Sequence, residues 1–233
     1  MELPKITFLA WSVQIIEQVS LVKNAHAVII CNSVDALHLS NYSFGFVSQL
    51  PDNQQITLII DDSHGLGITG KNGAGIFSKI KVSANVRLVV VSSLHKAMGL
   101  PGGVIFSDKS FIEEIRASAF FAACSPILPA YLHAFTQADE IYEKSRQKLL
   151  KNINLFIAEI KDLNLFFYQK NYPVFFTQQD DLYDFLLEKN IFIYSFAYPI
   201  RSGKPNTRIV LSAWHEAEDI LFLAEKCREF VFR

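Results

Sequence analysis

The sequence has few sulfur-containing residues and no excess of charge of either sign. Its 233 residues include three cysteines, and 22 basic against 23 acidic residues give a net charge of −1. Three widely spaced cysteines indicate a reduced, cytosolic compartment rather than a disulfide framework or a metal site. The balanced charge, without a basic stripe, argues against nucleic acid as a partner. No apolar run is long enough to cross a membrane, so no membrane partner is expected.

The N-terminal segment has some features of a signal peptide, but its pattern favours a helix. The tripeptide AHA at 25–27 imitates a cleavage site, and residues 6–16 are fairly apolar. Gln14 and Glu17 interrupt the apolar pattern, and apolar residues recur at helical spacing over 12–23. We therefore expect a helix over 12–23 and a cytoplasmic protein.

Apolar residues make up half of the chain, which is enough to bury a substantial core. Short runs of β-branched residues, apolar on both faces, predict the strands of a sheet that helices cover on both sides. These runs lie at 26–31, 56–60, 87–91 and 103–106. Polar residues follow two of the strand ends, where open α/β sheets place their ligand crevice. The first part of the chain therefore predicts an α/β domain.

From about residue 110 the pattern becomes that of a small α+β domain. Pro129 is expected to begin a long helix with an apolar stripe that extends to Ile160. The Phe-rich stretches at 120–121 and 165–167 are expected in a core rather than at an interface. We expect two domains, a truncated large domain at 1–135 and a long linking helix with a small C-terminal domain at 136–233. The other expected elements are helices at 110–118, 180–189 and 215–231, strands at 164–168, 173–177, 191–196 and 207–211, and a loop at 200–207.

The residues after the second predicted strand form one candidate site. The segment Asp61-Asp62-Ser63-His64 precedes a glycine-rich run that ends at Gly75. Two acids and a histidine after a buried strand are costly unless something pairs with them, and a capped turn is the simpler interpretation. Residues 65–71 fit most of a nucleotide-binding phosphate loop. Asn72, however, stands where a serine or threonine would bind magnesium, and acids precede the loop.

The residues after the third predicted strand form another candidate site, SSLHKAMGLPGG at 92–103. Lys96 follows the strand among glycines and hydroxyls, where an isolated lysine is usually solvated. Ser93 and Lys96 match the serine–lysine pair of penicillin-binding enzymes, but no Ser-Asp-Asn or Lys-Thr-Gly motif follows. The other interpretation is a Schiff-base lysine, which needs partial desolvation and flanking groups that hold a phosphate.

Both segments resemble motifs of the α-oxoamine synthases, which are fold-type I enzymes that use pyridoxal 5′-phosphate (PLP). DDSHGLGITGKNGAG at 61–75 resembles their Asp-x-x-His-Gly segment, and SLHKAMGLPGG at 93–103 resembles their Thr/Ser-x-x-Lys-Ala segment. Residues 124–130 and 207–215 resemble two further motifs, and the likeness covers roughly 27–233. The resemblance implies a partial fold-type I large domain with a mostly parallel sheet and a small C-terminal α+β domain.

The resemblance also implies a role for each matching residue. Asp61 would pair with the pyridine nitrogen of PLP, and His64 would hydrogen-bond the ring oxygen. Lys96 would carry PLP as a Schiff base and then act as acid and base at Cα. Ser93 would lie near the phosphate of the cofactor. No residue is assigned to a metal.

Two further residues and the reaction complete the implied site. Ser125 stands where the family has a threonine that reaches the phosphate of the neighbouring subunit. Arg208 would bind the substrate carboxylate, which suits its planar guanidinium. The implied enzyme is a homodimeric transferase that condenses an amino acid with an acyl-CoA, and an aminotransferase reaction is the nearest relative.

Two parts of the family pattern find no match in this chain. Nothing in 1–26 resembles the glycine-containing turn that binds the phosphate or the aromatic residue that stacks on the ring. Residues 32–39 stand where the family has a Glu-Gly-x-x-Ser-Met-Asp-Gly-Asp segment. Asn32 or Asp35 could take the place of a polar residue of that segment. Three interpretations follow: an enzyme whose dimer completes the site, a truncated or split chain without full activity, and a binding or scaffold subunit of a longer homologue.

Overall fold

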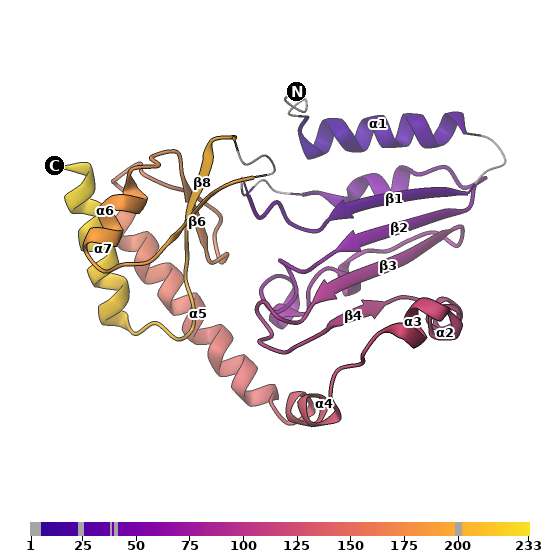
Figure 1. Ribbon diagram of the computed structural model, residues 1–233. Coiled ribbons are helices and arrows are strands. Elements are labelled where there is room, and N and C mark those ends of the chain that lie inside the picture. Colours follow the sequence, from indigo (N-terminus) through magenta and orange to yellow (C-terminus); the bar gives the residue numbers. More distant parts are fainter. Residues whose placement is uncertain (1–5, 23–25, 38, 40–41, 199–201) are drawn as a thin grey trace. The chain divides into compact units, whose positions relative to one another are not determined.

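The computed structural model describes residues 6–22, 26–37, 39, 42–198 and 202–233 (Figure 1). The chain folds into two compact units. The first comprises residues up to 35 together with 41–138, and the second comprises 36–40 together with 139–233. Among the described residues, no helix combines the length and the apolar character that a membrane crossing needs.

A four-stranded sheet with the order β1-β2-β3-β4 forms the framework of the first unit (Figure 1). β1 (Ala27–Asn32), β2 (Ile56–Asp61) and β3 (Val86–Ser93) are parallel, and β4 (Gly103–Phe106) pairs antiparallel with β3. The mostly parallel sheet is therefore confirmed. The three parallel strands bring their carboxyl ends to one edge, where both candidate segments begin.

One face of this sheet holds the core of the first unit. The helix α1 (Phe8–Leu21) lies along that core, and it begins where the Thr7 hydroxyl accepts a hydrogen bond of 3.1 Å from the Ala10 amide. The short 3-10 helix η1 (Phe44–Gln49) adds two buried side chains. The buried apolar residues of this core are Val19, Ile29, Phe46, Val47, Leu50, Ile56, Leu58, Ile60, Val86 and Val90.

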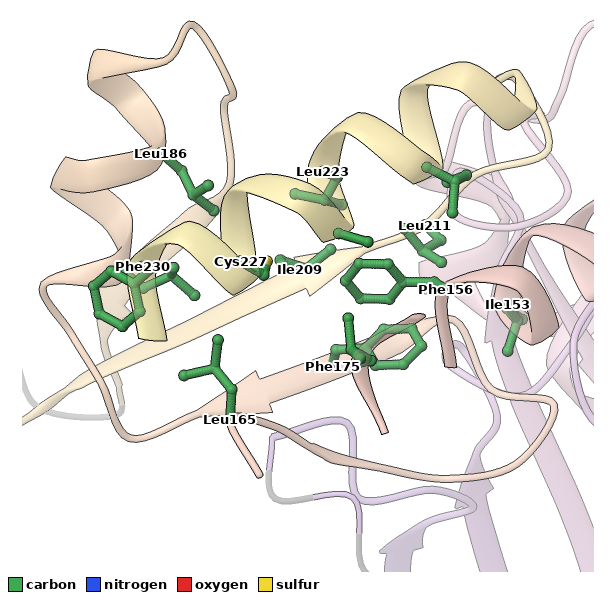
Figure 2. Close-up of a cluster of buried hydrophobic side chains, with 14 residues drawn as sticks. Ile153, Phe156, Leu165, Phe175, Leu186, Ile209, Leu211, Leu223, Cys227 and Phe230 are labelled. Atoms are coloured by element: carbon green, nitrogen blue, oxygen red, sulfur yellow. The ribbon is translucent and has the colours of Figure 1, made fainter. Parts of the chain in front are cut away.

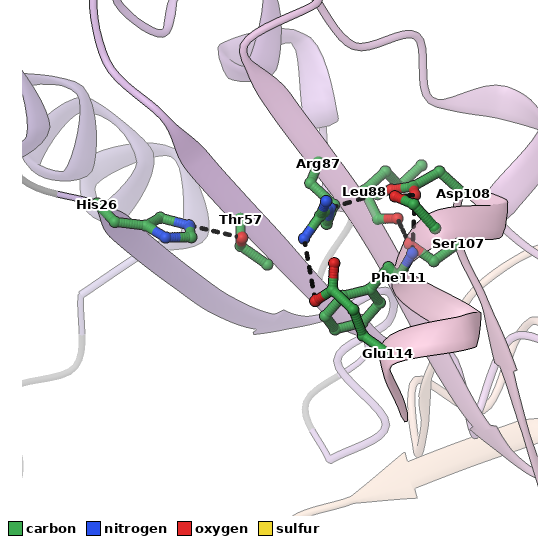
Figure 3. A network of polar contacts seen from close by, with 9 residues as sticks. His26, Thr57, Arg87, Leu88, Ser107, Asp108, Phe111 and Glu114 are labelled. Carbon is green, nitrogen blue, oxygen red and sulfur yellow. Dashed lines mark hydrogen bonds and ion pairs between the residues drawn. The ribbon is translucent and has the colours of Figure 1, made fainter. Parts of the chain in front are cut away.

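The opposite face is open at β1, where Val28 is 57% exposed and Ile30 is 67% exposed. The expectation that helices cover both faces is therefore wrong for this strand. The helix α2 (Lys109–Ala117) is held near β3 instead, because Nε of Arg87 donates to Asp108 at 3.0 Å (Figure 3). The Arg87 guanidinium also lies 5.0 Å from the centre of the Phe111 ring, a cation–π distance.

Helices follow α2, but their boundaries differ from those expected. Pro129 begins only a short helix, α4 (Pro129–Thr136), and the long helix α5 (Asp139–Ile160) has its own start with two acidic residues in its first turn. Acidic side chains favour a helix N-terminus, which explains a new start at Asp139. Phe120, in the intervening helix α3 (Ala119–Ala123), is 87% exposed. The expectation that residues 120–121 lie in a core is therefore wrong.

The second unit contains an antiparallel sheet with the order β5-β6-β8-β7. Its strands are β5 (Phe167–Tyr168), β6 (Val174–Thr177), β7 (Tyr194–Ala197) and β8 (Pro205–Val210). The predicted α+β character is confirmed. The loop expected at 200–207 ends earlier, because β8 begins at Pro205, and residues 200 and 201 lie outside the described residues.

Three helices pack with this sheet around the core of the second unit (Figure 2). They are α5, α6 (Leu182–Glu188) and α7 (Ala217–Val231). Phe156 and Phe175 are fully buried at its centre, with ring centroids 4.8 Å apart at an interplanar angle of 90°. This edge-to-face arrangement is favourable for aromatic pairs. The stripe predicted in α5 is confirmed for Ile153, Phe156 and Ile160, which lie in this core, whereas Ile141 is 65% exposed.

Candidate functional site

The two candidate segments lie at the ends of neighbouring parallel strands. β2 ends at Asp61 and β3 ends at Ser93. The Asp62 amide donates to the Val91 carbonyl at 2.8 Å, which continues the strand pairing one residue further. The Ser93 amide then donates to the Ser63 hydroxyl at 2.9 Å. Parallel pairing thus fixes where each segment leaves the sheet, and a side chain joins the two.

Lys96 and His64 are in direct contact across these segments. Nζ of Lys96 lies 2.8 Å from Nε2 of His64. The backbones also approach closely, because a Cβ placed on Gly67 would lie 2.8 Å from Cβ of Ala97. Gly67 has φ of 84°, which other residues rarely adopt. Glycine at this position therefore permits the contact between the two loops.

Lys96 lies on a tight turn that the backbone closes at both ends. The Leu94 amide donates to the Gly102 carbonyl at 3.0 Å, and the Leu100 amide donates to the Leu94 carbonyl at 2.9 Å. The Gly99 amide donates to the Lys96 carbonyl at 3.1 Å. The turn presents the lysine outward, and both Lys96 and His64 are exposed. The desolvation expected of a Schiff-base lysine is not supplied by the described part of this chain.

Asp61 and Asp62 differ sharply although they are adjacent. Asp61 is exposed, and its Oδ1 accepts a hydrogen bond of 2.8 Å from the Ser63 amide. It lies opposite Asn32 in the pairing of β1 with β2. Asp62 is only 2% exposed. Asp61 thus offers a carboxylate at the sheet edge, whereas Asp62 points inward.

The two serines lie near the same turn. The Ser93 hydroxyl accepts a hydrogen bond of 3.2 Å from the His95 amide. Ser125 is exposed and lines a shallow hollow together with Gly102 and Tyr131. The structure therefore brings Ser125 to the glycines that follow Lys96, within the first unit.

Arg208 lies in the second unit, in β8. Its Nη1 donates to the Ala36 carbonyl at 3.0 Å, and its guanidinium lies 5.0 Å from the centre of the Phe196 ring. Burial lowers the pKa of Arg208 from its usual value. Its Nε is buried and has no hydrogen-bond partner among the described residues. The Ala36 carbonyl and the Phe196 ring thus hold the side chain in place.

Ser63 and Asp62 belong to the predicted candidate segment, but the sequence assigned neither of them a role. Ser63 joins the two segments, and Asp62 lies inside the first of them. The sequence did contain one signal, namely two successive acids at a strand end. Successive side chains of a strand point to opposite faces, so the two acids cannot have the same surroundings. The spacing alone does not say which of the two does so.

The sequence model of the family described as aminotransferase class I and II matches residues 18–226, which include both segments and Arg208. The chain belongs to the aminotransferase class I and II family. One curated relative is the 8-amino-7-oxononanoate synthase of Thermosipho melanesiensis, with 29% identity over 194 residues. The match covers 77% of this chain and 49% of the relative. The chain therefore spans about half the length of the curated relatives it matches.

Two solved enzyme structures share the fold of this chain. The 8-amino-7-oxononanoate synthase of Francisella tularensis has a TM-score of 0.68 at 22% identity, covering 92% of this chain and 66% of that one. A serine palmitoyltransferase variant from S. paucimobilis, with a bound PLP–myriocin aldimine, has a TM-score of 0.76 at 13% identity. That match covers 97% of this chain and 60% of the other. The predicted fold-type I class is confirmed for this family member.

Proposed function

We propose that this chain belongs to a PLP-dependent transferase that condenses an amino acid with an acyl-CoA, as the α-oxoamine synthases do. The observation that carries the proposal is the 2.8 Å contact between Lys96 and His64 at the end of the strand beside Asp61. Three chemically different groups thus gather where α/β enzymes bind ligands. Membership of the aminotransferase class I and II family supports the same reaction class.

The donor groups in these segments fit the parts of PLP one by one. The Lys96 amine suits the aldehyde, the His64 imidazole suits the ring oxygen, and the Asp61 carboxylate suits the pyridine nitrogen. The Ser93 hydroxyl suits the phosphate, and the Ser125 hydroxyl suits the phosphate held by a neighbouring subunit. When bound, PLP supplies an electron sink that stabilises negative charge at the Cα of an amino acid.

Each group of the chain then has a task that its surroundings support. The Asp61 carboxylate favours a protonated pyridine nitrogen, because an opposite charge nearby stabilises the charged form. His64 and Lys96 are close enough to exchange a proton directly. Ala36 and Phe196 fix the guanidinium of Arg208, which would bind a substrate carboxylate.

We also propose a cytoplasmic homodimer. An exposed apolar surface on α3 and α4 supports self-association, since apolar patches of this kind mark protein interfaces. The odd number and wide spacing of the three cysteines favour a reducing compartment. The large exposed side chains of this surface, which we call the α3–α4 surface, are Phe120, Phe121, Leu128, Tyr131, Leu132 and Phe135.

The proposal is tested by titrating the purified chain with PLP and recording the visible absorbance of the Schiff base. We expect saturable absorbance that Lys96→Ala abolishes. Lys109→Ala is the control, because this lysine side chain is 91% exposed on α2 and forms only a surface ion pair with Glu113. The loaded protein is then mixed with acyl-CoA and single amino acids, and release of the CoA thiol is measured. Equal absorbance in wild type and Lys96→Ala would contradict the proposal.

A second candidate function is that of a subunit that works with a longer homologue. The exposure of Lys96 supports it. A mixture of the two proteins would then form a stable complex, and acyl-CoA turnover would depend on Lys96 only in the mixture. Turnover by a clean self-dimer would contradict this candidate.

A further inference from the structure

Asp62 ties together the two ends of the glycine-rich loop. Its carbonyl accepts hydrogen bonds from the Gly65 amide at 2.9 Å and from the Leu66 amide at 2.8 Å. Its side-chain Oδ2 accepts a hydrogen bond from the Ile76 amide at 2.9 Å. One residue thus fixes both the entry and the exit of the loop that follows His64.

Two glycines leave room for this carboxylate. A Cβ on Gly65 would lie 2.0 Å from Oδ1 of Asp62, and a Cβ on Gly75 would lie 2.1 Å from Oδ2. Both distances are far below any real contact, so the loop wraps the carboxylate at positions where only glycine fits. The same loop carries Gly67, which packs against the residue after Lys96.

The surroundings of the Asp62 carboxylate are mostly unfavourable to its charge. Burial and the neighbouring Asp61 raise its pKa, while the Ser33 hydroxyl, the Ile76 amide and Lys79 lower it, and burial is the largest effect. Oδ1 is fully buried and has no hydrogen bond of good geometry to any described residue. A buried carboxyl group with one incomplete oxygen costs stability. The Asp62 carboxyl group is therefore better explained by its bond to the loop than by a contribution to the free energy of unfolding.

We propose that Asp62 is a positioning residue, whose bond to the Ile76 amide holds the loop so that His64 faces Lys96. The inference rests on the proposed function, since the pair matters to chemistry only where a cofactor is held. Asp62 acts through His64 and does not itself contact the reacting groups.

The test compares three substitutions of Asp62. Asp62→Asn keeps an oxygen that accepts from the Ile76 amide, whereas Asp62→Ala and Asp62→Ser cannot reach it. Two measurements without PLP follow the loop: hydrogen exchange of the Ile76 amide and the NMR titration of His64. We expect Asp62→Ala and Asp62→Ser to speed exchange of the Ile76 amide on the order of tenfold and to shift the His64 titration. Asp62→Asn should keep the wild-type exchange rate and the wild-type titration. With PLP, the pH midpoint of the Schiff-base absorbance should shift in Asp62→Ala and Asp62→Ser and should stay at the wild-type value in Asp62→Asn.

A matched control separates positioning from stability. Val47→Ala removes core volume in η1 of the same unit and should lower the melting temperature without moving the His64 titration. The inference is overturned if Ala and Ser leave His64 unchanged, or if Val47→Ala shifts it equally. Failure of the wild type to bind PLP would contradict the proposed function alone, because the exchange and NMR measurements need no cofactor.

Discussion

Nζ of Lys96 and Nε2 of His64 lie 2.8 Å apart although 32 positions separate the two residues along the chain. Each follows a strand of the same parallel pair, and parallel strands end at the same edge of a sheet. The contact is therefore a consequence of topology, completed by the close approach of Gly67 to Ala97.

Gly75→Ala should destabilise the first unit far more than Gly99→Ala. Both glycines have positive φ, 71° and 64°, so both substitutions strain the backbone. At Gly75 the new Cβ would lie 2.1 Å from the Asp62 carboxylate, whereas at Gly99 it would meet no atom of the described residues within 4 Å. We expect a loss of about 1 kcal/mol at Gly99 and about 3 kcal/mol or more at Gly75.

Urea unfolding followed by tryptophan fluorescence measures this difference. The chain has two tryptophans, Trp11 in the first unit and Trp214 in the second. A Trp214→Phe background leaves Trp11 as the reporter of the first unit. Equal losses for the two glycine variants would contradict the packing described around Asp62.

Asp62→Asn should become relatively more stable as the pH rises. The folded state raises the pKa of Asp62, chiefly by burial, above the unfolded value of about 3.9. A raised carboxyl pKa contributes stability that is complete below the unfolded pKa and is lost as the pH rises through the folded pKa. Asparagine does not titrate, so the variant escapes this loss.

The measurement is the free energy of unfolding of both proteins from about pH 4 to neutrality, since the window opens at the unfolded pKa. The difference between Asp62→Asn and wild type should grow in favour of the variant along this series. A constant difference would show that the carboxyl group titrates as it does in the unfolded chain.

Cys124 directly follows α3, so it should be the one thiol that reacts quickly in the folded, monomeric Phe120→Asp protein. It is exposed, whereas burial raises the pKa of Cys31 and of Cys227 to about 12 each. Reaction requires the thiolate, which is scarce in a buried thiol of that pKa. With a chromogenic disulfide reagent we expect one fast equivalent per chain, lost in Cys124→Ser, and three equivalents after denaturation. Fast labelling in Cys124→Ser would contradict the burial of the other two.

Charged substitutions on the α3–α4 surface should dissociate the proposed homodimer. Phe120 is 87% exposed and Leu128 is 62% exposed, so Asp at either position costs the folded subunit little. In an interface the same carboxylate would be desolvated without a partner. Sedimentation velocity should show a dimer for wild type and a monomer for Phe120→Asp and Leu128→Asp. Phe192→Asp, at an 82% exposed site in the second unit, is the control and should remain a dimer.

Local patterns in the sequence were sufficient to predict most elements of both sheets. The strand at 103–106 was placed within its observed bounds, because apolar runs between glycines and polar residues are unambiguous. The helix boundary at Asp139 was missed, since Pro129 is equally compatible with a short and a long helix. The exposure of Phe120 was also missed, because composition does not say which phenylalanines reach a core.

The candidate site was predictable in its residues but not in its geometry. Asp61, His64 and Lys96 stood out through their positions after strands, and the structure places these strands side by side. That Asp62 points inward, or that Ser63 bonds to the Ser93 amide, depends on the fold of the glycine-rich loop. Such long-range contacts are not encoded in local periodicity. The roles of Lys96, Asp61, His64, Ser93 and Ser125 toward a cofactor, and of Arg208 toward a substrate, stay predictions.

The most direct test of the central claim is to reduce the PLP complex with borohydride and to locate the modified lysine by peptide mass spectrometry. Reduction turns a Schiff base into a stable secondary amine, so the label records which lysine held the cofactor. We predict one phosphopyridoxyl group per chain, on Lys96. A label distributed over surface lysines such as Lys109, with Lys96 unmodified, would contradict the account.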